Sequence, residues 1–243
     1  MNLLSRVICV AAMCTSFLAA GTSSAQAPLA GRDYTVINPA QSTDSGKKIE
    51  VLEFFWYGCP HCYHLEGPLK AWLKKRPADV DFRYQPTIFD VASWSPLARF
   101  FYTMDAMGLA GKYHDDIFKA IHVENKNQLV TNPRAMADWL GAIGVDKQKF
   151  LDTYNSFSVN TRTQRAIEMT RAYDIPGTPA VVIDGKYLTS PSMTLSGDQN
   201  VSYDRFFIVV DALIAQARKD HGMKDAAPAS KTAPAKKAPT KKS

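Results

Sequence analysis

The chain has 243 residues and a formal net charge of +6. The excess positive charge lies near the two ends, at Arg6 and in the stretch from Lys224 onward, where six lysines stand against one aspartate. Between them, residues 26–223 carry basic and acidic side chains in equal number. With this balance, a basic nucleic-acid-binding face is not indicated for the folded part, and we expect no nucleic acid among its partners.

Residues 1–25 have the pattern of a secretory signal peptide. Arg6 is their only charge, and an apolar stretch and then small residues follow it. Cleavage after Ala25 is favoured over cleavage after Ala27, which would leave Pro28 as the first residue. The apolar stretch is shorter than the roughly 20 residues that span a bilayer, so an uncleaved membrane anchor is the less favoured alternative.

Export also determines which cysteines remain. Cys9 and Cys14 lie within the signal peptide, so the mature protein keeps Cys59 and Cys62 alone. An exported protein with two closely spaced cysteines meets an oxidising compartment, in which they can pair with each other. The expected location is the periplasm.

The other end of the chain, residues 224–243, is a low-complexity segment of Ala, Pro and Lys. It lacks the apolar surface needed to offset the entropy of ordering, which predicts disorder. A solubilising extension is the favoured interpretation, and weak attraction to an anionic surface is the alternative.

The two remaining cysteines lie where a strand is expected to become a helix. The run 49–57 is apolar and β-favouring, as in a buried central strand. After Cys62, Leu65, Leu69 and Trp72 recur at helical spacing. Cys59 is therefore predicted at a helix N-terminus, where unpaired N–H groups should bring the pKa of its thiol well below about 8.5.

The other predicted elements surround a long helical stretch. Strands are expected at 34–37 and 80–84, and strand character returns at 180–183, followed by a two-residue turn at Asp184-Gly185 and a strand at 186–189. A last helix is expected from Tyr203 to about Lys219. Between the third strand and residue 173 the pattern is helical, with capping residues expected at Ser95, Asn132, Asp146 and Ser158.

This order predicts an α/β protein with a thioredoxin-like fold, a mixed central sheet flanked by helices and interrupted by an all-helical insertion. The predicted thioredoxin-like domain comprises residues 26–92 and 160–223, and the insertion comprises residues 93–159.

A pair of cysteines two residues apart also occurs in haem and zinc proteins. Haem attachment needs a histidine directly after the second cysteine, where this chain has Tyr63. Zinc needs four ligands, and Cys59, His61, Cys62 and His64 are too crowded to wrap a metal well. We therefore expect a redox-active pair and no metal.

A second signal lies far along the chain, in the segment Ile175–Ala180. Two prolines surround Gly-Thr directly before the predicted strand, and this pattern predicts a cis peptide bond between Thr178 and Pro179.

Together the segments Val51–Phe55, Cys59–Tyr63 and Gly177–Pro179, with the helical insertion, resemble the DsbA family of periplasmic thiol–disulfide oxidoreductases, in the thioredoxin superfamily. The resemblance covers roughly residues 33–220. It implies that Cys59 is an exposed nucleophile and that Cys62 is a buried resolving thiol. It also implies that Pro60 and His61 form the dipeptide between them, with His61 placed to stabilise the Cys59 thiolate.

The resemblance further implies that Thr178 and Pro179 align the substrate backbone and that Glu53 and Glu66 occupy the family's acidic positions. Glu53 lies within an apolar strand, where a carboxylate needs a purpose, and we expect it to handle a proton for Cys62. For Glu66 two interpretations remain open: a functional acidic residue, or an ordinary carboxylate in the first turn of a helix. His114 and His122, in the helical stretch, carry no functional signal.

The predicted function is that of a dithiol oxidase, since groups that stabilise the Cys59 thiolate make the disulfide a stronger oxidant. The resemblance implies reduced, unfolded exported proteins as substrates, a DsbB-type inner-membrane oxidase as the reoxidising partner, and no cofactor besides the Cys59–Cys62 disulfide. A monomer is expected.

Two alternatives remain open. One is an isomerase or reductase, although a dimerisation domain of the isomerase type would not fit in the short stretch before Tyr34. The other is a binding module in which the disulfide is merely structural.

Overall fold

The computed structural model describes residues 27–195 and 200–223. The predicted signal peptide and C-terminal tail therefore lie outside the described residues. Within the part that is described, no helix has the length and apolar character needed to cross a membrane.

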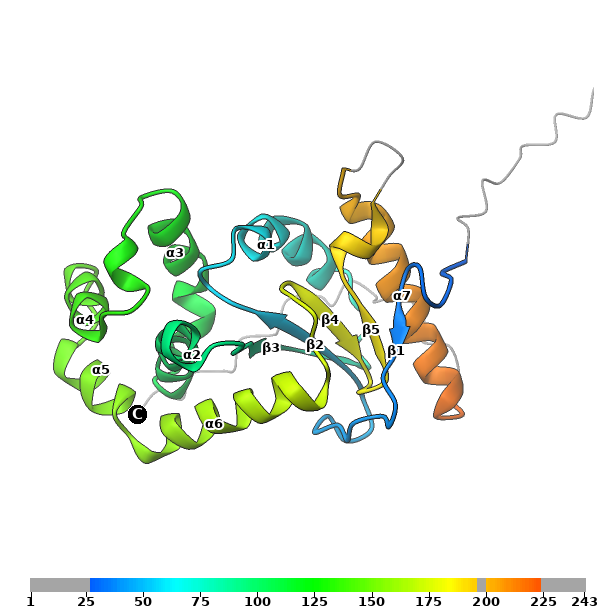
Figure 1. Ribbon diagram of the computed structural model, residues 1–243, viewed down its shortest axis with the longest axis horizontal. Coiled ribbons are helices and arrows are strands. Elements are labelled where there is room, and N and C mark those ends of the chain that lie inside the picture. The colour runs from blue at the N-terminus through cyan, green and yellow to red at the C-terminus, as the bar shows by residue number, and fades with distance from the viewer. Residues whose placement is uncertain (1–26, 196–199, 224–243) are drawn as a thin grey trace, which may run out of the picture.

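The centre of the molecule is a mixed five-stranded sheet, in the order β1-β5-β4-β2-β3 (Figure 1). Every residue of the central strand β2 is buried, as its mainly apolar sequence predicts, and this includes its two glutamates, Glu50 and Glu53. It pairs parallel with β3 and antiparallel with β4. The strands are β1 (Thr35–Val36), β2 (Ile49–Phe55), β3 (Val80–Pro86), β4 (Ala180–Ile183) and β5 (Tyr187–Thr189).

The predicted turn between the last two strands is present. Asp184 and Gly185 both have positive φ, of 54° and 63°. Pairing resumes at Tyr187 rather than at Lys186, so the loop takes three residues instead of the predicted two.

Helices cover both faces of the sheet. Helix α1 (Pro60–Leu73) and helix α7 (Tyr203–Asp220) pack on one face, against Ile49, Val51 and Ile183. The end of helix α6 (Phe157–Ala172) reaches the opposite face, where Leu52 and Phe54 pack near Met169 and Tyr173. This arrangement places the start of α1 at the carboxyl end of the central strand (Figure 1). The thioredoxin-like prediction is confirmed.

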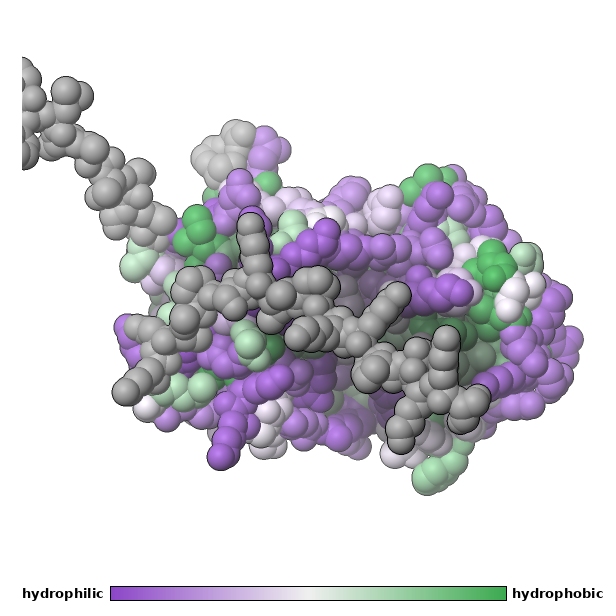
Figure 2. All heavy atoms as spheres, turned by 180° about the vertical axis from the view of Figure 1, so that it is seen from behind, coloured by the Kyte–Doolittle hydropathy of each residue, from purple (hydrophilic) through white to green (hydrophobic). Residues whose placement is uncertain are grey.

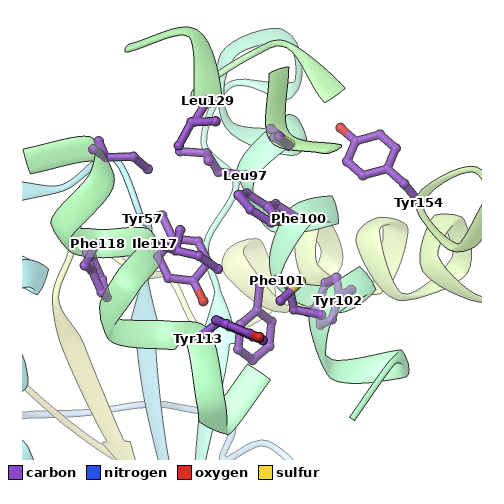
Figure 3. Packing of buried hydrophobic residues seen from close by; sticks show 14 of the residues in the cluster. Tyr57, Leu97, Phe100, Phe101, Tyr102, Tyr113, Ile117, Phe118, Leu129 and Tyr154 are labelled. Carbon is purple, nitrogen blue, oxygen red and sulfur yellow. The ribbon is translucent and has the colours of Figure 1, made fainter. Parts of the chain in front are cut away.

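The helical block stands beside the sheet and has its own core. Its elements are α2 (Val91–Ala106), α3 (Ala110–His122), a 3₁₀ turn (Asn127–Leu129), α4 (Pro133–Ala142), α5 (Lys147–Tyr154) and α6. Figure 3 shows Tyr57, at the end of the central strand, beside Ile117 and Phe118 of α3. The active-site turn thus shares a core with the block. The boundaries at 93 and 159 remain a prediction, and α6 runs unbroken past the second.

Two of the four predicted helix caps are confirmed. Asn132 and Asp146 accept backbone N–H bonds at the starts of α4 and α5. The prediction at Ser95 was wrong, because Asp90 caps α2 five residues earlier and Pro96 lies inside the helix. The prediction at Ser158 was also wrong, since Ser156 accepts from the Val159 N–H and caps α6.

The outer surface is mainly hydrophilic on the face seen in Figure 2, with separate hydrophobic spots. The most exposed large hydrophobic side chain among the described residues is Phe157, which is 84% exposed at the start of α6. It contrasts with Phe150 of α5, which is fully buried in the core of the helical block.

We expect Phe150→Ala to lower the free energy of unfolding by about 3–5 kcal/mol, through lost burial and the cavity left behind. Phe157→Ala is the matched control, and it should change stability by less than about 0.5 kcal/mol. Urea unfolding followed by circular dichroism measures both. Equal effects of the two substitutions would contradict the packing described for the helical block.

Candidate active site

The chain turns sharply between the central strand and α1. Cys59 is the N-cap residue of α1, Pro60 follows at the first helical position, and the Cys59 N–H donates to the Trp56 carbonyl at 2.9 Å. Gly58 permits this turn, because a Cβ atom there would lie 2.4 Å from the Trp56 indole. Cys59 thus lies where the unpaired N–H groups of the first turn converge.

The two cysteines differ strongly in burial and ionisation. Neither forms a disulfide in the structure, and Cys59 is 8% exposed whereas Cys62 is 0% exposed. Cys59 is therefore less exposed than expected. A hydrogen bond from Cys62, with further ones from the Thr178 side chain and the N–H groups of Cys62 and His61, lowers the pKa of the Cys59 thiol from 9.0 to about 5. Burial, followed by the interaction with Cys59, raises the pKa of Cys62 well above its ordinary value.

The two residues between the cysteines, Pro60 and His61, are both exposed. The His61 N–H is among the groups that lower the Cys59 pKa. Stabilisation of the thiolate by the His61 ring remains a prediction.

The Thr178–Pro179 peptide bond is cis, which confirms the prediction, and it faces the cysteine turn. The Cys59 thiol donates to the Thr178 carbonyl at 3.4 Å. Pro179 is held from behind by Ser190, whose hydroxyl donates to the Pro179 carbonyl at 2.9 Å. A second cis bond, Asn38–Pro39, was not foreseen from the sequence.

Glu53 lies beneath the cysteines on the central strand. It is 0% exposed, and neither of its carboxyl oxygens has a hydrogen-bond partner among the described residues. Burial, then the charges of Glu66 and Cys59, raises the pKa of Glu53 well above its ordinary value. The structure therefore places a buried carboxylic acid where its charge interacts with both Cys59 and Cys62.

Glu66 is also buried, but its surroundings are quite different. It accepts from the Tyr84 hydroxyl at 3.2 Å and lies 3.2 Å from His114 Nε2 and 3.7 Å from Lys70 Nζ. These donors satisfy both carboxyl oxygens of Glu66. The two acidic side chains thus have opposite environments, one without donors and one with several.

Histidines of α3 are site residues that the sequence reasoning missed. His114 Nδ1 lies 2.8 Å from the Tyr57 hydroxyl, and His122 Nε2 lies 2.8 Å from the Tyr57 carbonyl. Both polar ends of Tyr57, two residues before Cys59, are therefore held by one helix of the insertion. The spacing of eight residues places both histidines on one face of a helix, but only the fold reveals what that face contacts.

An aromatic surface lies beside the turn. Trp56 stacks on Trp94 with ring centroids 4.2 Å apart, and Phe89 packs edge-on against Trp94 while remaining 46% exposed. Trp94 is half-buried and, through its stacking on Trp56, lies next to the site.

The arrangement suits the transfer of a disulfide. It combines a stabilised thiolate with a second thiol one helical turn away, which are the groups that thiol–disulfide exchange requires, and it places a buried acid beside them. No group of three or more side chains suited to holding a metal occurs among the described residues.

Comparison with known proteins agrees with this chemistry. Residues 50–203 match the family model for the DSBA-like thioredoxin domain. The chain is 44% identical over 182 residues to a thiol:disulfide interchange protein DsbA from Burkholderia cepacia, covering 74% of this chain and 84% of that protein. It is 39% identical over 215 residues to the DsbA protein of Bordetella parapertussis, covering 88% and 97%.

Solved structures give the same result. The crystal structure of Pseudomonas aeruginosa DsbA superposes with a TM-score of 0.73 at 37% identity, covering 80% of this chain and 97% of that one. The family match, the fold and the paired cysteines at the N-terminus of α1 lead to one conclusion. This chain belongs to the DsbA family of thiol–disulfide oxidoreductases.

Proposed function

We propose that the protein donates its Cys59–Cys62 disulfide to reduced, unfolded proteins exported to the periplasm. A substrate thiolate attacks Cys59 Sγ, the bond between the two cysteines breaks, and Cys62 leaves and takes up a proton. A second substrate thiolate then attacks the substrate sulfur of the mixed disulfide and displaces Cys59 as a thiolate. Two substrate thiols become one disulfide, the protein is reduced by two electrons, and one proton goes to solvent.

The contrast between the two cysteines carries the proposal. With a pKa of about 5, Cys59 is an excellent leaving group at neutral pH, so the second step releases the substrate readily. Stabilising this thiolate stabilises the reduced protein and makes the disulfide a stronger oxidant. The same contrast disfavours a purely structural disulfide, which has no need of a stabilised thiolate.

Glu53 is the proton partner of Cys62 in this proposal. Burial raises its pKa and so favours the protonated form, and its charge interacts with that of Cys62. It can therefore donate when Cys62 leaves and accept when the protein is reoxidised. A carboxyl group without hydrogen-bond partners is costly to bury, and this role accounts for its presence.

The substrate would lie against the cis-proline loop and the aromatic surface. Thr178 and Pro179 face Cys59, and Phe89, Trp56 and Trp94 offer apolar contact beside it. Contacts with the substrate backbone and with apolar side chains do not depend on one particular substrate sequence, which suits a protein that acts on many different substrates. We further propose that a DsbB-type inner-membrane oxidase restores the disulfide and that the protein acts as a monomer without a further cofactor.

Oxidised protein should convert a reduced two-cysteine peptide to its disulfide in a single turnover. In the reverse direction, reduced Cys62→Ser given the oxidised peptide should stop at a mixed disulfide between Cys59 and the peptide, because no second protein thiol remains to release it. Mass spectrometry of both reactions is the measurement. Reshuffling of a scrambled substrate without net oxidation would favour an isomerase, and a disulfide inert to the peptide would favour a binding module.

Iodoacetamide should alkylate Cys59 alone in the reduced native protein at pH 5–6. The reason is the pKa of about 5 at Cys59 against the raised pKa and complete burial of Cys62. The rate should follow a titration centred near pH 5, read by mass spectrometry at short times. Labelling of both cysteines at equal rates would contradict their proposed roles.

Reduction should stabilise the fold at pH 7. Folding lowers the pKa of Cys59 from 9.0 to about 5, so its contribution grows as pH rises from 5 and is lost as pH falls through 5. Urea unfolding midpoints of the reduced and oxidised forms, measured between pH 5 and 8, give the difference in stability between them. Titratable groups present in both forms contribute equally and cancel in this difference. A reduced form that is the less stable one at pH 7 would refute the proposed direction of transfer.

A further inference from the structure

His114 of the helical insertion connects two parts of the active site. It is 5% exposed, and its two ring nitrogens lie 3.2 Å from Glu66 Oε1 and 2.8 Å from the Tyr57 hydroxyl. Since a carboxylate can only accept, the ring proton belongs on Nε2, and Nδ1 accepts from Tyr57. The ring therefore has a fixed orientation and donates to Glu66.

Aromatic rings keep this position apolar. His114 packs against Phe55, Tyr84 and Phe118, with the Tyr84 centroid 4.2 Å away. The charged and titratable groups around it are Glu66 and Lys70 of α1, Tyr57 and Glu53 of the central strand and its turn, Tyr84 and Arg83 of β3, Asp105 of α2, Asp115 of α3 and Arg162 of α6.

Glu66 lies close to Glu53 because of the strand register. Glu53 pairs with Tyr84 across the parallel β2–β3 ladder, so both side chains point to the α1 face of the sheet. The Tyr84 hydroxyl donates to Glu66 from that position. The carboxylate that His114 holds is therefore the charge next to the buried acid beneath the cysteines.

We propose that His114 is a positioning residue for proton exchange at Cys62, which it serves by fixing the Glu66 carboxyl group beside Glu53. The inference rests on the proposed role of Glu53. The charge of Glu66 disfavours a second charge on Glu53, and so favours the protonated Glu53 that can donate when Cys62 leaves. The helical insertion thereby supplies a group that acts on the reaction without touching the substrate or the cysteines.

Two cavities lie beside this group of side chains. A cavity of about 430 Å³ between α1 and α3 is lined by Glu66, Lys70 and Asp115. Another of about 290 Å³ is lined by Tyr84 and His114, beside Phe101 and Asp105. Neither is lined by Cys59, Cys62 or Pro179, so we expect them to offer a route for proton exchange with solvent that is separate from the cysteine turn.

The test compares Tyr57→Phe/His114→Phe with Tyr57→Phe alone. The added phenyl ring retains the aromatic packing, and Tyr57→Phe removes the hydroxyl that would otherwise be left buried without its acceptor. His114→Gln is the conservative variant, since its amide can donate to Glu66 and accept from Tyr57. His64→Gln, an exposed histidine on α1, controls for the loss of a histidine.

Two readouts separate a positioning role from a structural one. The first is the titration of the Glu53 carboxyl carbon by NMR in oxidised protein with ¹³C-labelled glutamate, assigned by its absence in Glu53→Gln. The second is the rate at which a small dithiol reduces the Cys59–Cys62 disulfide, measured across a range of pH. At each pH the rate for the variant is divided by that for wild type, so that the ionisation of the dithiol cancels.

In Tyr57→Phe/His114→Phe, we expect the Glu53 titration and the pH dependence of disulfide reduction to lie about one pH unit lower than in Tyr57→Phe. A change of this size corresponds to loss of a hydrogen bond to a charged group. His114→Gln and His64→Gln should stay close to wild type. Glu66→Gln should produce the same movement, and adding the His114 substitution to it should change nothing further. Unmoved profiles, with only a lowered unfolding midpoint, would overturn the inference, as would additive effects of the two substitutions.

The Glu53→Gln variant separates the proposed role of Glu53 from that of His114. If it leaves the pH dependence of disulfide reduction unchanged, the proposed role of Glu53 fails, and the inference fails with it. If it flattens that dependence while the His114 variants leave it in place, the inference about His114 alone is refuted.

Discussion

The chemistry of this protein depends on a thiolate placed at the N-terminus of a helix. Cys59 is the first non-helical residue before α1, so the N–H groups of His61 and Cys62 point at its sulfur. The fully buried central strand fixes this point in space, and Gly58 lets the chain turn there beneath the Trp56 ring. Moving the turn by one residue would remove the sulfur from the donors that stabilise it.

The position of Cys59 at the start of α1 also explains why the two cysteines differ, and the two glutamates beneath them differ as well. One helical turn into α1, Cys62 is completely buried and has its pKa raised, while Cys59 has its pKa lowered. Beneath them, Glu66 has several donors and Glu53 has none among the described residues. Cys59 is therefore suited to carrying the charge, while Cys62 and Glu53, whose pKa values are both raised by burial, are suited to carrying a proton.

Much of this could be predicted from the sequence, for identifiable reasons. Local patterns were sufficient for the central strand, for the position of Cys59 at the start of a helix and for the cis bond before Pro179, because each is determined by neighbouring residues. Helix starts were less certain. Ser95 before Pro96 has the pattern of a helix start, but Asp90 caps α2, and the proline lies inside the helix without ending it.

The histidines of α3 show where sequence reasoning stops. Their partners are Tyr57 and Glu66, which lie about 50 residues or more away along the chain, and only the packing of the insertion against the turn brings them together. The contact of a histidine with a residue of another element cannot be predicted from the residues next to it in the sequence. The insertion interrupts the thioredoxin-like fold at the one edge where α3 can reach both the turn before Cys59 and the acidic side chain behind Cys62. Its contribution to the active site is therefore long-range contact, supplied by elements that hold no cysteine of their own.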